Sequence, residues 1–449
     1  MSTKDLINLL IDLSNNVIRK FNEYLSSGKI RVIRRLYTRY RIKEFKYNKS
    51  SAGFHRTTER IARNVLDPYT LHEFIKDLSK EEIFKRVIET MAKLYDVQKD
   101  QVNFWLEEFI DRLIDRYYSG KLNHKELTYL INTFINEIEG NPIDWHIEVW
   151  LKGIFLEVPA IELEKGVVLR APRKEDLEYD TSLKIPPPPT LTPTGMSFIP
   201  DAIIEINKRM KMQLPIYPYK EKLITSLQLY KLCSVYEVGT IWVPEGILSF
   251  ASTTYKPEMW FRTTYKCVLE DCDVKRLPSF IKDMNARIPL DEKSGRILID
   301  NYIGVALSRY QDVLLKPEPL PNKIAYATFG LEALYLKGGE RSELAQRLAL
   351  RVAKVLSKLN IDHSKDILNN VKRAYKIRSA FVHGEPLKSG KYQSRDLLDN
   401  IAKYLRLSLL LFMQASIRKD KLIDLIDYAL VDKDSDEKLE QIIKAVHYL

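Results

Sequence analysis

The spacing of hydrophobic residues predicts helices over the first 150 or so residues. Leu6, Leu9, Leu10, Leu13 and Val17 follow the i, i+3, i+4 spacing that places side chains on one face of a helix. Residues 83–94 and 104–117 repeat this pattern. We therefore expect residues 1–150 to form a helical N-terminal domain.

The pattern changes near Gly153, where short β-branched stretches bounded by Gly or Pro are typical of strands. A helix is expected near residues 220–236, and the prolines within 184–200 predict a stiff, extended linker. Residues 151–290 are thus predicted to be a mixed α+β domain. Its expected strands are 154–158, 166–170, 202–206, 240–243 and 248–252.

Helical spacing returns after Ile297, which predicts a helical domain over residues 291–418 and a helical tail over 419–449. The whole chain is therefore expected to be mainly α, with strands confined to the middle domain. The expected C-terminal helices are 299–314, 323–336, 341–359, 364–382 and 395–417.

The composition adds limits to this picture. With 449 residues the chain is long enough for three domains, and its 16 glycines argue against a glycine-cradled nucleotide site. The N-terminus lacks a basic segment followed by a long apolar core. The most apolar stretch, 405–413, is far shorter than the roughly 20 residues that cross a bilayer. We expect a cytoplasmic protein that does not enter a membrane.

Three cysteines are too few for a disulfide scaffold. Cys267 and Cys272 could form half of a zinc site, but no histidine cluster lies near them in the sequence. The favoured interpretation is that these two residues and Cys233 are partly buried free thiols in a reducing compartment. We expect neither a metal nor a cofactor.

The formal net charge of +11 comes almost entirely from one segment. Residues 29–63 hold twelve Lys or Arg and only two acids, Glu44 and Glu59. Guanidinium groups pair with phosphates, and interleaved aromatic rings stack on unpaired bases. This basic patch predicts nucleic-acid binding; the alternative is a helix with a basic, solvated face. The expected RNA-binding residues here are Arg31, Arg34, Arg35, Arg39 and Arg41.

A second candidate site lies on the helix expected at 364–382. At 100° per residue, Ala374, Ile377, Ala380 and Phe381 fall on the side that faces the core. The opposite arc carries Tyr375, Arg378, Ser379, Val382 and His383, with Lys372 and Lys376 on its flank. Of these, Arg378, Ser379 and His383 are candidates for catalysis, and Lys372, Tyr375 and Lys376 are candidates for contact with RNA.

Gly384 and Pro386 are expected to end this helix directly after His383. A histidine can exchange protons at neutral pH, and an arginine can grip a phosphate in two places. RNA supplies its own nucleophile, the 2′-hydroxyl, so neither a metal nor a protein nucleophile is required. From spacing alone, a capped and solvated helix end is the commoner explanation of an Arg and a His five residues apart.

Residues 375–384, with Arg-x4-His-Gly at the end of a helix, resemble the HEPN superfamily, and most closely its Apea-like branch. Residues 329–334 and 343–351 are similar to the helices that precede the motif in that branch. The resemblance covers about 120 residues and implies a helical bundle whose motif is completed across a homodimer. It further implies a metal-independent endoribonuclease that leaves a 2′,3′-cyclic phosphate.

In that family reading, His383 moves protons and Arg378 holds the scissile phosphate. Ser379 follows Arg378 where active members commonly carry Asn, Asp or His. Ser379 and His383 are i, i+4 neighbours, so the Ser379 hydroxyl is expected to orient the imidazole. Glu332 is expected either to pair with Arg378, to orient His383 or to face solvent. Tyr375 is expected either to stack on a base or to pack a dimer seam.

The leading hypothesis is therefore a HEPN-type ribonuclease, for which family analogy implies a role in defence or stress. A non-catalytic protein of the same fold that binds nucleic acid or docks a partner is the alternative. A structural subunit whose basic patch holds an acidic protein is the third.

Overall fold

The computed structural model describes residues 3–48, 51–181, 199–211, 216–256, 264–385 and 394–448. Within them the chain forms fourteen α-helices and eleven strands in three sheets, with 54% of residues helical and 20% in strands. The expectation of a mainly α protein is therefore wrong, because strands also occur in the N-terminal region. All but residues 199–200 of the proline-rich linker expected at 184–200 lies outside the described residues.

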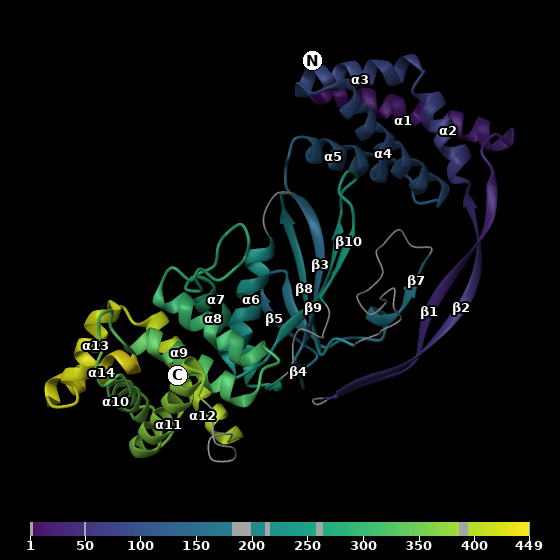
Figure 1. The fold of residues 1–449 in the computed structure, drawn as a ribbon. Helices are drawn as coiled ribbons and strands as arrows, with labels where there is room; N and C mark the ends of the chain where they lie inside the picture. Colours follow the sequence, from purple (N-terminus) through teal and green to yellow (C-terminus); the bar gives the residue numbers. More distant parts are fainter. Residues whose placement is uncertain are drawn as a thin grey trace.

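The N-terminal helices pack around one hydrophobic core (Figure 1). Helix α1 buries Leu6, Leu10, Leu13 and Val17, as its spacing predicts. Asp67 and Asn123 cap two of the later helices by accepting hydrogen bonds from backbone amides. The helices are α1 (Thr3–Ser26), α2 (Pro68–Leu78), α3 (Glu82–Tyr95), α4 (Lys99–Tyr118) and α5 (His124–Ile138).

The basic patch is a long β-hairpin and not a helix, which corrects the prediction for this segment. Strand β1 (Val32–Asn48) pairs antiparallel with β2 (Ser51–Leu66) along its whole length. Most non-basic residues of β1 are Val, Ile, Tyr, Thr or Phe, which favour extended backbone. Ile42 is buried in a cluster with Trp150 of the middle sheet, so tertiary packing stabilises the half of the hairpin nearer the turn.

The middle of the chain forms a six-stranded sheet in the order β10-β9-β3-β8-β6-β5. Every pairing within it is antiparallel. The expected strands other than 248–252 are confirmed in outline; at that place the strand begins only at Ser252. The six strands are β3 (Ile143–Lys152), β5 (Ala160–Glu164), β6 (Val167–Arg170), β8 (Ala202–Met210), β9 (Tyr236–Pro244) and β10 (Ser252–Tyr255).

The two faces of this sheet have different partners. Ile147, Val149 and Leu151 of β3 pack in the core that includes helices α6 (Ile216–Tyr230) and α7 (Asp273–Asn285). Side chains alternate along a strand, so Trp150 faces the other side, where it meets the hairpin. Short strand β7 (Tyr179–Asp180), preceded by the 3-10 turn η1 (Glu175–Leu177), extends the hairpin by pairing with β1.

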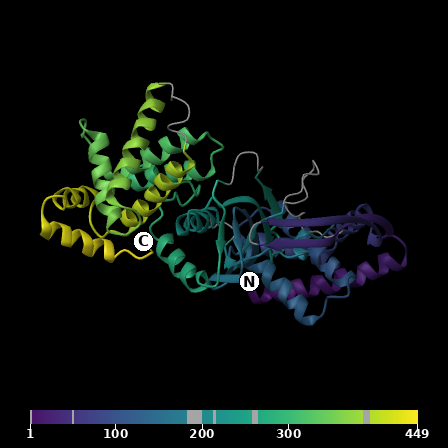
Figure 2. The same ribbon diagram turned by 90° about the horizontal axis from the view of Figure 1, so that it is seen from below.

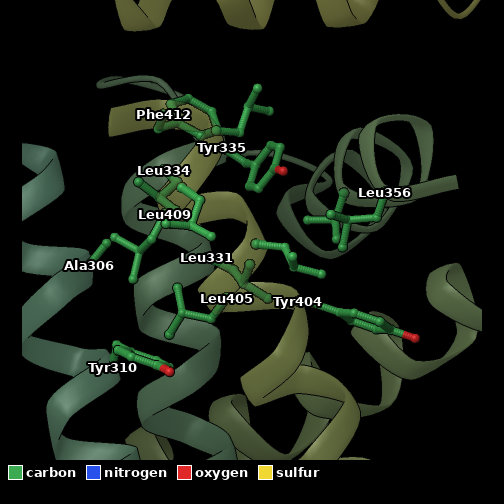
Figure 3. Packing of buried hydrophobic residues seen from close by; sticks show 14 of the residues in the cluster. Ala306, Tyr310, Leu331, Leu334, Tyr335, Leu356, Tyr404, Leu405, Leu409 and Phe412 are labelled. Atoms are coloured by element: carbon green, nitrogen blue, oxygen red, sulfur yellow. The ribbon is translucent and has the colours of Figure 1, made fainter. Parts of the chain in front are cut away.

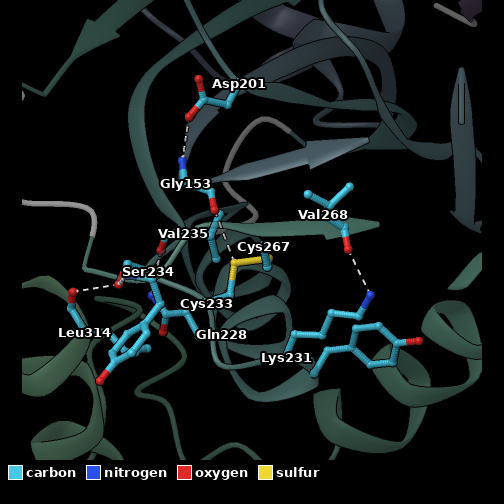
Figure 4. The surroundings of a disulfide bond; sticks show 12 residues. Gly153, Asp201, Gln228, Lys231, Cys233, Ser234, Val235, Cys267, Val268 and Leu314 are labelled. Atoms are coloured by element: carbon cyan, nitrogen blue, oxygen red, sulfur yellow. Dashed lines mark hydrogen bonds between the residues drawn. A yellow bond between two sulfur atoms is a disulfide. The ribbon is translucent and has the colours of Figure 1, made fainter. Parts of the chain in front are cut away.

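A disulfide joins Cys233, which follows α6, to Cys267, the first residue of β11 (Cys267–Leu269) (Figure 4). The expectation of free thiols is wrong for these two residues. Strand β11 pairs with β4 (Ile154–Leu156), and this long-range contact brings the two cysteines together. Cys272 is free and exposed, and the described residues hold no group of three or more side chains suited to a metal.

The C-terminal helices confirm the five predicted from spacing and share the largest core of the protein (Figure 3). Tyr335 and Ser408 share a buried hydrogen bond of 2.9 Å within that core. No described helix has the length and apolar character needed to span a membrane. The helices are α8 (Tyr302–Leu315), α9 (Leu320–Tyr335), α10 (Leu344–Ser357), α11 (Ser364–His383), α12 (Arg395–Gln414), α13 (Lys419–Tyr428) and α14 (Lys433–Lys444).

Candidate functional site

The last turn of α11 carries the Arg-x4-His motif. Helix α11 ends at His383, and Gly384 takes a left-handed conformation with φ of 67°. The amide of Glu385 donates to the carbonyl of Ala380 at 2.9 Å, which satisfies a helix-end acceptor. The predicted helix end after His383 is confirmed.

Arg378 points back onto α9, where it forms an ion pair with Glu332. Its Nη2 and Nε donate to Glu332 Oε2 at 2.9 and 3.2 Å, and the two side chains are 23% and 13% exposed. The guanidinium carbon lies 4.8 Å from the ring centre of Phe329 and 5.6 Å from that of Tyr375. Of the three alternatives for Glu332, the structure has the ion pair with Arg378.

Burial raises the pKa of Glu332, and the positive charge of Arg378 opposes that rise. Glu332 Oε1 is buried and has no hydrogen-bond partner among the described residues. Among the described residues, only Oε2 of the Glu332 carboxylate therefore accepts hydrogen bonds. A buried pair of this kind fixes the position of the guanidinium strongly, because separating it would leave an uncompensated charge.

His383 is exposed, and the described residues provide no hydrogen bond between it and Ser379. Phe381, expected in the core, is 40% exposed and contacts the edge of Tyr326 at 6.1 Å between ring centres. Val382 is also exposed. The prediction for Phe381 is wrong because burial of α11 ends at Ala380, so the final residues of the helix project beyond the core.

The flanking candidates are also partly accessible. Lys376 is exposed, and Lys372 and Tyr375 are half-buried. The ring of Tyr375 packs on the C-terminal core and beside the Arg378 guanidinium. Both expected roles of Tyr375, stacking on a base and packing a dimer seam, therefore stay hypotheses.

The hairpin residues expected to bind RNA fall into two groups. Arg39 pairs with Asp180 at 3.1 Å, and Arg41 pairs with Glu178 at 3.1 Å. Arg31, Arg34 and Arg35 are exposed, and the guanidinium of Arg35 lies 5.7 Å from the ring centre of Tyr37. The acids that neutralise the first group come from the segment around β7, about 140 residues away in sequence.

Sequence reasoning missed Arg56, Arg60 and Arg63, which belong to the second strand of the hairpin. They are paired with the first strand through the β1–β2 register. An alternating pattern of apolar and polar residues could have suggested two strands, but only the register shows which arginines share a face.

The two candidate sites do not lie together within one chain. Figures 1 and 2 both show α11 at one end of the molecule and the hairpin toward the other, with the middle sheet between them. A single copy therefore presents two separate surfaces for a ligand. Comparisons with protein-family models, with curated proteins and with solved structures give no match to this chain.

Proposed function

We propose that this chain is a metal-independent endoribonuclease of the HEPN type that acts on RNA as a homodimer. The observation that supports the proposal best is the arrangement at the end of α11. Arg378 is held in place by Glu332 and by two aromatic rings, and an exposed His383 follows five residues later.

The proposed reaction needs only groups from this chain and from RNA. The 2′-hydroxyl oxygen forms a bond to the adjacent phosphorus while the bond to the 5′-oxygen breaks. His383 accepts the proton of the 2′-hydroxyl or donates one to the leaving 5′-oxygen. Arg378 stabilises the charge that develops on the phosphate oxygens. The products are a 2′,3′-cyclic phosphate and a 5′-hydroxyl.

The homodimer is part of the proposal because one chain presents a single copy of His383. Residues five apart on a helix differ by about 140° in direction and by roughly 7.5 Å along the axis. The exposed Phe381 and Val382 give the last turn of α11 an apolar surface beside His383. Pairing of two such turns about a two-fold axis would bring in a second His383 and would cover these side chains.

A non-catalytic RNA-binding or partner-docking protein is the second candidate. It is favoured because Nε and Nη2 of Arg378 already donate to Glu332, which leaves fewer donors for a phosphate.

We propose a cytoplasmic location together with the ribonuclease function. The Cys233–Cys267 disulfide argues against this location, since such bonds are rare in reducing compartments.

The test is incubation of the purified protein with single-stranded RNA in excess chelator. Wild type and a His72→Ala control, altered at an exposed histidine of α2, should both cleave and leave 2′,3′-cyclic phosphate ends. His383→Ala should lose the activity. Equal cleavage by all three proteins would identify a contaminant. Cleavage by none of them, with RNA bound, would favour the non-catalytic function.

A further inference from the structure

The register of the hairpin sorts its arginines onto two faces. Cross-strand partners point to the same side of a two-stranded sheet, and successive residues alternate between sides. Between residues 34 and 42, the even positions of β1 and their partners form what we call face B. Its paired positions are Arg34–Asn64, Leu36–Ala62, Thr38–Arg60, Tyr40–Thr58 and Ile42–Arg56.

The opposite side, face A, is largely neutralised by acids. Arg35 lies opposite Arg63, and Arg39 lies opposite Glu59. Asp180 accepts from both Arg39 and Arg63, the latter at 2.6 Å. With Glu178 bound to Arg41, four arginines on this face meet three acids. These contacts tie β7 to the hairpin, and they make face A a structural surface.

Face B carries three arginines and, within the paired residues 34–42 and 56–64, no acid. Arg34 and Arg60 are exposed, whereas Arg56 is half-buried, because face B is covered near Ile42, its cross-strand partner, which is buried in the cluster with Trp150. Arg56 lies 5.0 Å from the ring centre of Tyr40, a contact that orients a guanidinium without using its N–H donors. Leu36 is 65% exposed on the same face. This surface combines uncompensated positive charge with hydroxyl and apolar groups.

We propose that face B binds the phosphate backbone of single-stranded RNA through Arg34, Arg56 and Arg60. The choice of RNA rests on the proposed function. Arg34, Arg60 and Arg56 lie at the ladder positions of residues 34, 38 and 42 of β1. Neighbouring arginines are therefore about 13 Å apart along the strand direction. Arginine forms paired hydrogen bonds to phosphate oxygens, and Thr38, Thr58 and Asn64 offer further donors on the same face.

This assignment differs from the one drawn from sequence. It keeps Arg34, leaves out Arg31 and Arg35 as well as Arg39 and Arg41, which are held in ion pairs, and adds Arg56 and Arg60 of the second strand. Figure 1 shows the hairpin apart from α11, the helix that ends at His383. Face B would thus hold RNA at a distance from the proposed cleavage site.

The experiment measures binding of a fluorescein-labelled uridine 20-mer in the His383→Ala background, in which the probe is expected to stay intact. Fluorescence anisotropy is recorded at several salt concentrations. The variant Arg34→Gln, Arg56→Gln, Arg60→Gln is compared with Lys99→Gln, Lys433→Gln, Lys444→Gln. Each variant loses three charges, and the three control lysines are at least 65% exposed and belong to helices α4 and α14, not to the hairpin.

The face B variant should bind about tenfold or more weakly near 0.1 M salt. The slope of log K against log salt should become shallower by about 2, as the loss of three phosphate contacts on a single strand requires. The control variant should keep both values near those of the parent protein. Equal losses in the two variants, or no binding by the parent, would overturn the proposal. Stronger, face B-dependent binding of duplex DNA would also overturn it.

Failure of this proposal can be told from failure of the proposed function. If RNA binding depends on face B but the wild type does not cleave RNA, the RNA-binding surface stands and the ribonuclease function is refuted. If the wild type cleaves RNA and the triple variant cleaves it equally well, the ribonuclease function stands and the RNA-binding surface is refuted. Circular dichroism checks folding of the triple variant. If the triple variant does not fold, Arg60→Gln alone is tested, since Arg60 is exposed. It should weaken binding and make the salt slope shallower by about 0.7, as the loss of one phosphate contact on a single strand requires.

Discussion

Glu332 Oε2 accepts two hydrogen bonds from Arg378, from Nη2 at 2.9 Å and from Nε at 3.2 Å. The other carboxylate oxygen, Oε1, is buried without a hydrogen-bond partner in the described part of the chain. The pair joins α9 to α11 at the place where α11 leaves the core. It makes the position of Arg378 depend on Glu332 and links the proposed chemistry to the stability of the helical domain.

Replacing Arg378 with Met should destabilise the protein by about 3 kcal/mol, because the Glu332 carboxylate would remain buried without its counterion. Urea unfolding followed by circular dichroism measures the change. The double variant Arg378→Met, Glu332→Leu should regain much of the loss, since an apolar pair can replace a buried ion pair.

The same variant should also gain a pH dependence. Burial raises the pKa of Glu332 in the folded protein, and loss of Arg378 removes the charge that opposes the rise. A raised carboxyl pKa means that the folded state takes up the proton more readily, so stability falls as the pH rises through that pKa. Arg378→Met should therefore recover stability as the pH is lowered through the raised pKa of Glu332. A variant as stable as wild type at every pH would contradict the buried ion pair.

Glu137 of α5 should be a stability-determining contact between the N-terminal helices and the loop after β9. Its carboxylate accepts hydrogen bonds from the amides of Ile247, Leu248 and Ser249 and from the Ser249 hydroxyl. Glu137→Ala should cost about 3 kcal/mol, because hydrogen bonds to a charged group are lost and partly buried amides are left unpaired.

Gly246 gives this contact a matched test. A Cβ at Gly246 would lie 2.2 Å from Glu137 Oε1, and the backbone of Gly246 is outside the left-handed region, so the expected penalty is steric. Gly246→Ala should cost about 1–3 kcal/mol in the wild type and clearly less in Glu137→Ala. Additive losses in urea unfolding would show that the two residues are independent.

His146 should be protonated at neutral pH. The Glu148 carboxylate, 3.6 Å from its Nε2, raises the pKa of His146 to about 9 against the effect of partial burial. A raised histidine pKa stabilises the fold fully below pH 6.5, and this contribution is lost as the pH rises to 9. NMR titration of the imidazole should give a midpoint well above 6.5. A midpoint at or below 6.5, or no change in the pH profile of stability in His146→Gln, would contradict the pair.

Reduction of the Cys233–Cys267 disulfide should destabilise the protein by about 3–4 kcal/mol, from the loop entropy of its 34-residue separation. A thiol reagent added to unfolded, unreduced protein should label one cysteine, the free Cys272. Cys272→Ser should reduce that labelling to none and leave the unfolding transition unchanged. Three labelled thiols before reduction would refute the bond.

Regular helices were predictable because each buries one stripe of side chains whose period is visible locally. The stripe Ile367, Val371, Ala374 and Ile377 of α11 appears in the sequence and in the core. The prediction was wrong at Phe381, because α11 continues to His383 whereas the elements that cover it extend only as far as Ala380. Spacing reveals which residues share a side of a helix; it does not reveal how far the covering elements extend.

The hairpin also combines a feature that the sequence shows locally with features that depend on distant contacts. Its strong positive charge was evident from composition, but its strands depend on cross-strand pairing and on packing of Ile42 against the middle sheet. Likewise, Asp180 lies far along the chain from Arg39 and Arg63, yet it neutralises both. Such contacts join residues more than 100 positions apart, and local pattern carries no information about them.

By itself, the sequence determined the helices of the C-terminal region, the end of α11 at His383 and the concentration of positive charge in residues 29–63. The tertiary structure decided that Arg378 pairs with Glu332, that Cys233 and Cys267 are joined, and that the hairpin has one neutralised face and one basic face. The physical reason is range: periodicity and capping act within a few residues, whereas ion pairs and strand register depend on which distant segments meet.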